Sequence, residues 1–181
     1  EALRLWGRER LLSYMVRVIR RFRPDVIVTR FSHNGGSGHG QHTAVGHLSL
    51  EAFEAAADPE RFPDQLKQGL QQWRAKRLYW NIYGLDRLRE EAKATLGSLV
   101  RIDTGQYNSF LGRSYAEVAG ESRSMHRSQA MGTWQRKGSV PAFFAHIAGD
   151  PASRDLFDGI DTTWGRVPRA HKVARFLEQA H

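Results

Sequence analysis

Arg23-Pro24-Asp25-Val26-Ile27-Val28-Thr29 is the stretch that decides the fold, together with the loop Ser32-His33-Asn34-Gly35-Gly36-Ser37-Gly38-His39-Gly40-Gln41-His42 that follows it. The apolar run is short and β-branched and comes after a proline, which predicts a buried parallel strand. Residues 43–57 after the loop have the pattern of a helix. A strand, a glycine-rich loop and a helix place the histidines at the carboxyl end of a strand, where open α/β sheets have their ligand sites.

Upstream of this stretch, residues 3–22 carry apolar side chains at spacings of three and four, which predicts an amphipathic helix that ends at Arg23-Pro24. Downstream, further strands are predicted at 77–82 and 99–103, and helices at 85–96, 115–135 and 171–180, whereas 141–147 has no clear pattern. The alternation predicts the α/β class. We expect a Rossmann-like, mostly parallel sheet with helices on both faces.

Composition limits the functional classes. The 181 residues are 40% hydrophobic and contain no cysteine, so a metal site would have to use histidine and carboxylate ligands. No apolar run approaches the roughly 20 residues that span a bilayer. The net charge of +8 suggests an anionic partner. A solvated basic face is favoured over a nucleic-acid surface, because no nucleic-acid motif is present and Arg17, Arg20, Arg21 and Arg23 lie at a helix end, where cations suit the dipole.

His39 and His42 are the candidate chemical pair. Their spacing of three at a helix start lets both rings face one cavity. One can ligate a metal while the other handles protons, but loop histidines without a metal are an equally valid interpretation of this spacing alone. Asp158 and Asp161 around Gly159 have too few neighbouring ligands for calcium, so a turn is expected there.

The residues of this loop resemble a known family. Residues 23–29 and 35–44 are similar to the second signature of the PIG-L/LmbE family of zinc-dependent N-deacetylases, in which Arg-Pro-Asp-Val-Val precedes a glycine loop, Gly-His-Pro-Asp-His and a helix. Residues 76–79 and 126–129 also resemble this family, and the run 112–129 is similar to its large multidomain bacterial members. The resemblance covers 1–135, which implies a deacetylase domain there, with 136–181 as its extension or the start of a linker.

The resemblance also implies roles for individual residues. His42 matches a zinc ligand, and His39 matches the histidine that, when protonated, stabilises the oxyanion and assists the leaving amine. Gln41 replaces an aspartate that orients a histidine, and an amide cannot stabilise an imidazolium by charge. Ser37 replaces a tyrosine found in some members and is too short for the same reach. The expected substrate contacts are Ser37, Gly38, His126 and Gln129, with helix packing as the alternative for the last two.

One family signature is absent. Ala-His-Pro-Asp-Asp-Glu, which supplies two further metal ligands and the general base, does not occur in these 181 residues. A catalytic zinc has three protein ligands, so His42 alone would hold zinc weakly. We therefore expect the metal motif and a further strand upstream of Glu1 in a longer parent protein, and no activity from this piece alone.

Two functions follow as hypotheses. The first is a zinc-dependent hydrolase that removes the N-acetyl group from an N-acetylglucosamine-type amino sugar or its conjugate, a small molecule whose phosphate or other acidic group would suit the positive charge. The second is a non-catalytic domain of the same fold that binds a carbohydrate or an anionic ligand, which Gln41 and Ser37 favour. Nucleic acid is not an expected partner.

Overall fold

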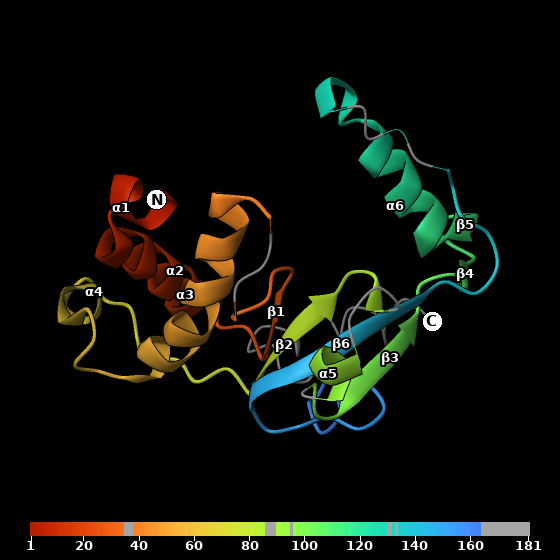
Figure 1. The fold of residues 1–181 in the computed structure, drawn as a ribbon. Helices are drawn as coiled ribbons and strands as arrows, with labels where there is room; N and C mark the ends of the chain where they lie inside the picture. Colours follow the sequence, from red (N-terminus) through yellow and green to blue (C-terminus); the bar gives the residue numbers. More distant parts are fainter. Residues whose placement is uncertain (35–37, 86–89, 95, 130–131, 133, 164–181) are drawn as a thin grey trace.

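The computed structural model describes residues 1–34, 38–85, 90–94, 96–129, 132 and 134–163. Its helices are α1 (Ala2–Trp6), α2 (Arg8–Phe22), α3 (Gly40–Ala57), α4 (Pro63–Lys67), α5 (Glu90–Ala94) and α6 (Tyr115–Ser124), with a short 3₁₀ helix at Arg127–Gln129. Its strands are β1 (Val26–Thr29), β2 (Arg77–Ile82), β3 (Leu99–Asp103), β4 (Tyr107–Asn108), β5 (Arg113–Ser114) and β6 (Pro141–Gly149). Figure 1 shows their arrangement.

The central sheet has the strand order β1-β2-β6-β3. β1 and β2 are parallel, with Val28 beside Tyr79, and β6 runs antiparallel to both β2 and β3. Three strands therefore point the same way and β6 opposes them. The α/β class is confirmed, and strands are present within 23–29 and at 77–82 and 99–103, as predicted. The first of them, β1, was expected to be buried but lies at the edge of the sheet, with Val28 45% exposed. β6, in the region without a clear sequence pattern, inserts between β2 and β3.

The two faces of this sheet are covered differently. On one face α2 and α3 pack together around Leu12, Val16, Leu48 and Ala52, with Ile27 of β1 against them. Figure 1 shows both helices on the same side of β1. On the other face Tyr79 and Val100 pack against two apolar residues that follow β6, Ala152 and Leu156. Thus, among the described residues, helices cover one face, and an irregular segment lies where a second helical layer was expected.

Polar contacts explain how that irregular segment can cover a sheet. The Asp158 carboxylate accepts hydrogen bonds from the backbone N–H groups of Ser153 and Arg154. Buried Arg77 donates to the carbonyl oxygens of Leu156 and Asp158, so the backbone polar groups are paired without a helix. The turn predicted around Asp158 is therefore present.

Three predicted helices differ from the observed ones. The helix expected over 3–22 is divided at Gly7, whose φ of 78° lies outside the helical region. The helix expected over 115–135 ends at Ser124, and Gly120 packs so closely that an added Cβ would lie 2.9 Å from the Trp134 carbonyl oxygen of the returning chain. Of the helix expected at 85–96, residues 90–94 are helical, while 86–89 and 95 lie outside the described residues. The helix expected at 171–180 also lies outside them.

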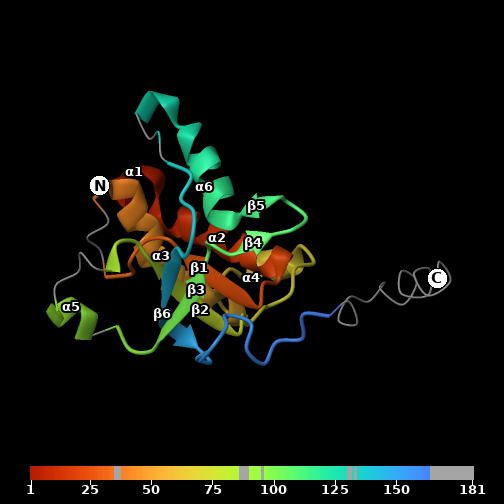
Figure 2. The same cartoon turned by 90° about the vertical axis from the view of Figure 1, so that its right-hand side faces the viewer.

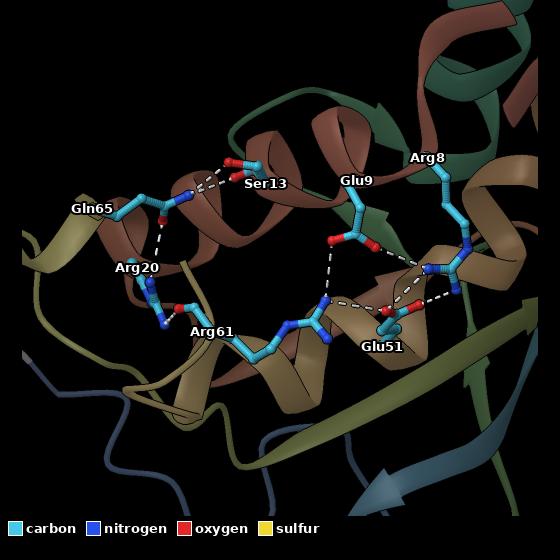
Figure 3. A network of polar contacts seen from close by, with 7 residues as sticks. All are labelled: Arg8, Glu9, Ser13, Arg20, Glu51, Arg61 and Gln65. Atoms are coloured by element: carbon cyan, nitrogen blue, oxygen red, sulfur yellow. Dashed lines mark hydrogen bonds and ion pairs between the residues drawn. The ribbon is translucent and has the colours of Figure 1, made fainter. Parts of the chain in front are cut away.

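Buried Arg20 fixes the carboxyl end of α3. Although it lies in a basic run at the end of α2, it is 0% exposed, so the prediction of a dispersed, solvated charge is wrong for this residue. Its guanidinium donates to the carbonyl oxygens of Ala55, Ala56 and Asp58 at 3.1, 3.2 and 2.7 Å. It also donates to Gln65, whose amide donates to Ser13 of α2 (Figure 3).

The amino end of α3 is fixed by close packing. A Cβ on Gly46 would clash with the carbonyl oxygen of Ser32, so only glycine lets the helix approach the loop after β1 this closely. On the exposed side, Glu51 of α3 pairs with Arg8 and Arg61 (Figure 3). The end of β1 and the start of α3, which flank the histidine loop, are therefore fixed in place by packing and hydrogen bonds. No helix in the described part is long and apolar enough to span a membrane.

Candidate functional site

The rings of Phe31, His42 and His39 stack on one another between the end of β1 and the start of α3. His39 occupies the N-cap position of α3 with extended backbone (φ −94°, ψ 144°), and His42 lies in the first helical turn. The two imidazole rings are nearly parallel, with centroids 5.1 Å apart. On its other side His42 stacks on Phe31, with centroids 4.0 Å apart. The structure thus brings the predicted pair together beside the carboxyl end of β1.

The remaining predicted loop residues are neighbours of this pair in the sequence. Gln41 is exposed and makes no hydrogen bond to either imidazole within the described residues. Gly38 has a φ of 78°, which favours glycine, and open space around it. Ser37 lies outside the described residues. His33, half-buried in the same loop, has a buried Nδ1 without a hydrogen-bond partner in the part of the chain that the structure describes.

His126 and Gln129 lie elsewhere. Both are exposed beyond the end of α6, and the His126 Nδ1 is 3.3 Å from the Arg123 carbonyl oxygen. Figure 1 shows α6 standing well apart from α3, and Figure 2 shows β4 and β5 at its foot. The structure therefore does not bring these two residues to the histidine stack, because α6 is attached through its amino end and projects away from the sheet.

A positively charged cleft opens at the carboxyl ends of β1, β2 and β3. One cavity of about 750 Å³ is lined by Arg30 after β1, Asn81 and Tyr83 at the end of β2, and Arg136 before β6. A second cavity of about 510 Å³ shares Arg30, Tyr83 and Arg136 and extends to Arg123 of α6. This is the edge at which open α/β sheets bind ligands. We call these two cavities together the arginine cleft.

The arginine cleft and the histidine stack are linked through the chain. Arg30, which lines both cavities, directly precedes Phe31, whose ring stacks on His42, whereas neither His39 nor His42 lines the cleft. The Arg30 guanidinium donates to the Asn81 side-chain oxygen and lies over the Tyr83 ring, 5.1 Å from its centroid. Burial lowers the pKa of Arg30 from its ordinary value, Tyr83 raises it and the positive charge of Arg123 lowers it further.

Sequence reasoning missed the arginine cleft. One signal was available, since Arg30 directly follows a predicted strand and therefore stands at its carboxyl end. Arg123 and Arg136 gave no such signal, because they reach the cleft only through the path of α6 and the returning chain.

The described residues do not gather the ligands of a metal centre. In the described ranges, no three histidine, aspartate or glutamate side chains come together as ligands of one ion. A catalytic zinc has three protein ligands. The described residues therefore do not by themselves fit a zinc site, and His42 stands as a single candidate ligand.

Comparisons with known proteins add sequence relatives. No family model matches the chain. It is 36% identical over 88 residues to a 1D-myo-inositol 2-acetamido-2-deoxy-alpha-D-glucopyranoside deacetylase of Geodermatophilus obscurus, which covers 48% of this chain and 28% of the relative. It is also 40% identical over 78 residues to a mycothiol S-conjugate amidase of Streptomyces coelicolor. This match covers 43% of this chain and 25% of the relative. A Streptomyces griseus protein with the same name as the Geodermatophilus deacetylase is 26% identical over 145 residues. This match covers 76% of this chain and 43% of the relative.

Among solved structures, N,N'-diacetylchitobiose deacetylase from Pyrococcus horikoshii, complexed with its inhibitor, has 13% identity and a TM-score of 0.42, covering 85% of this chain and 55% of that chain. The first sequence relatives are much longer than the matched segment, which spans about a quarter of their length, 28% and 25% in the two cases. Over nearly half of its own residues, this chain is thus similar to part of curated deacetylases and amidases whose names specify amino-sugar or mycothiol conjugates.

Proposed function

We propose that the protein carrying this chain is an N-deacetylase of the PIG-L/LmbE type, which hydrolyses the acetamide of an N-acetylglucosamine-type amino sugar or its conjugate. The observation that carries the proposal is the stacked His39–His42 pair at the carboxyl end of β1. The names of the sequence relatives support the reaction class.

The histidines would have different tasks. His39 is exposed at the N-cap of α3, so its ring is accessible to a bound substrate and can give a proton to the amide nitrogen as the C–N bond breaks. His42 is half-buried between Phe31 and His39, and stacking on both sides fixes its ring orientation. Zinc dependence is part of the proposal, with His42 as one ligand. Two more ligands would have to come from outside the described residues.

Three alanine variants of the full-length protein test this assignment. We expect His39→Ala to retain bound zinc but lose about 100- to 10,000-fold in turnover, the usual contribution of an acid–base group. His42→Ala should lose both zinc and turnover. His47→Ala is the matched control, because His47 is exposed further along the same helix. Release of free amine from N-acetylglucosamine conjugates measures turnover, and wild-type turnover in His39→Ala would refute the proton-transfer role.

A non-catalytic binding domain is the second candidate. The observation that favours it is the lining of the arginine cleft, in which no described residue is a carboxylate able to act as a general base. This alternative predicts sugar binding without any acetate release by the full-length protein, even with zinc supplied.

A further inference from the structure

We propose that the arginine cleft recognises an anionic group, a phosphate or a carboxylate, on the sugar substrate. Arg30, Arg123 and Arg136 would be the recognising residues. The inference names the substrate class of the proposed enzyme and to that extent rests on the proposed function.

The first support is the shape and place of the cleft. Its two cavities of about 750 and 510 Å³ share Arg30, Tyr83 and Arg136, and each is within the usual size range of a small-molecule site. Arg30 lines both cavities and directly precedes Phe31, which stacks on His42, so one chain segment contributes to the cleft and to the histidine stack.

The second support is unbalanced charge. Arg30, Arg123 and Arg136 line one cavity, and no acidic residue lines it among the described residues. None of the three forms an ion pair in the part of the chain that the structure describes. Lys93 in the larger cavity already pairs with Glu90 at 2.7 Å, so it contributes less. Guanidinium groups gathered without a counter-ion repel one another, and one shared anion relieves this repulsion.

The third support is that the Arg30 guanidinium is already oriented by its neighbours. Its guanidinium is held by Asn81 and by the Tyr83 ring, which fixes a planar fork of donors in the cleft. Such a fork binds phosphate and carboxylate oxygens in pairs. Trp134 also lines the smaller cavity and is 90% exposed, so it offers a flat apolar surface for a sugar ring beside the cations.

The arrangement fits a small molecule better than a nucleic acid. Nucleic-acid sites spread cations along a stripe or one helix face so that they follow a phosphate backbone. Here the cations converge from the end of β1, from α6 and from the segment before β6 onto one open cleft.

Calorimetric titration of the full chain tests the inference. The probes are N-acetylglucosamine 6-phosphate, N-acetylmuramic acid as the carboxylate, and neutral N-acetylglucosamine. We expect at least one of the two acidic sugars to bind about 10-fold or more tightly than the neutral one, and its affinity to fall as salt is raised. The double variant R123Q/R136Q should weaken that binding by about 10-fold for each guanidinium removed.

The matched control is R4Q/R74Q, which removes the same charge from two exposed arginines outside the cleft. Equal weakening in the control would overturn the inference, as would equal affinity for acidic and neutral sugars. Tighter binding of an eight-nucleotide single strand than of either acidic sugar would also overturn it. Circular dichroism confirms that each variant is folded before titration.

Binding and turnover separate the two proposals. Anion-dependent binding without deacetylation by the full-length protein would contradict the proposed function and leave the arginine cleft assigned. Deacetylation of a neutral sugar without preference for an acidic one would contradict this inference and leave the function intact.

Discussion

Replacing buried Arg20 by methionine should destabilise the protein severely. The Arg20 side chain is 0% exposed, and five of its hydrogen bonds end on backbone carbonyl oxygens at or after the end of α3. Methionine has a similar length but no donor. The substitution would leave those carbonyl groups without the guanidinium, and water has no free access to replace it.

The expected loss of folding free energy can be worked out from these hydrogen bonds. A hydrogen bond to a charged group contributes roughly 1.5–3 kcal/mol, but the cost of burying the guanidinium offsets much of the sum over Arg20. The same burial lowers the pKa of Arg20 from its ordinary value, because it disfavours the charged guanidinium. Leaving a buried acceptor without a donor costs about 1–3 kcal/mol, so over these carbonyl groups we expect a net loss of roughly 3–5 kcal/mol. For a chain of this size, that corresponds to a decrease in Tm of roughly 6–20 °C.

Urea and thermal denaturation followed by circular dichroism measure the loss. Arg21→Met is the matched control, because Arg21 is exposed on the same helix turn, and we expect it to change stability by at most about 0.5 kcal/mol. Arg20→Lys keeps the charge but replaces the fork by a single donor group, so it should still lose about half of the effect or more. An Arg20→Met variant within about 1 kcal/mol of Arg21→Met would refute the reasoning.

Three further outcomes are expected. Gly46→Ala should lower the free energy of unfolding by about 1–3 kcal/mol, because the added methyl group overpacks against the Ser32 carbonyl. Gly40→Ala is the control, because its new Cβ would lie 3.8 Å from its nearest neighbour and should cause no such loss. Equal melting temperatures of the two variants would contradict this. Backbone N–H donors, Arg154 first and then Ser153, lower the pKa of Asp158 to about 2. Its contribution to stability is therefore present above about pH 4 and is lost as the pH falls through about 2. Asp158→Asn should flatten the pH dependence of Tm in that window, and an unchanged acid-unfolding curve would count against the network. Metal analysis of the 181-residue chain after mild chelation should find well under stoichiometric zinc, and one firmly held ion per chain would show that undescribed residues complete a site.

Local signals made the unit around β1 predictable. A β-branched run after Pro24, a glycine-rich loop and a helical pattern are each features of consecutive residues, and the structure has a strand, a loop and a helix there. The spacing of His39 and His42 likewise determined that both lie at the start of α3. Their stacking on each other follows from this local geometry, but the contact with Phe31 also needs the packing of α3 on the loop, which Gly46 permits.

β6 shows why other parts were not predictable. Its residues 141–149 mix aromatic and small side chains without a polar alternation, and most of them are partly buried on both faces of the sheet. The pairing of Ala145 with Trp80 on one side and Leu99 on the other joins residues far apart in the sequence. No local period records such a pairing.

The sequence by itself thus determined the α/β class, three strand positions and the place of the histidine pair, because these depend on neighbouring residues. Only the tertiary structure decided which arginines matter and for what. Arg20 and Arg21 are adjacent in one basic run, yet the first is buried under the end of α3 and the second is exposed. Arg30, Arg123 and Arg136 meet in one cleft although more than 90 residues separate the first from the others. The physical reason is that burial and charge clustering arise from contacts between distant segments, which the order of the strands and the packing of the helices determine.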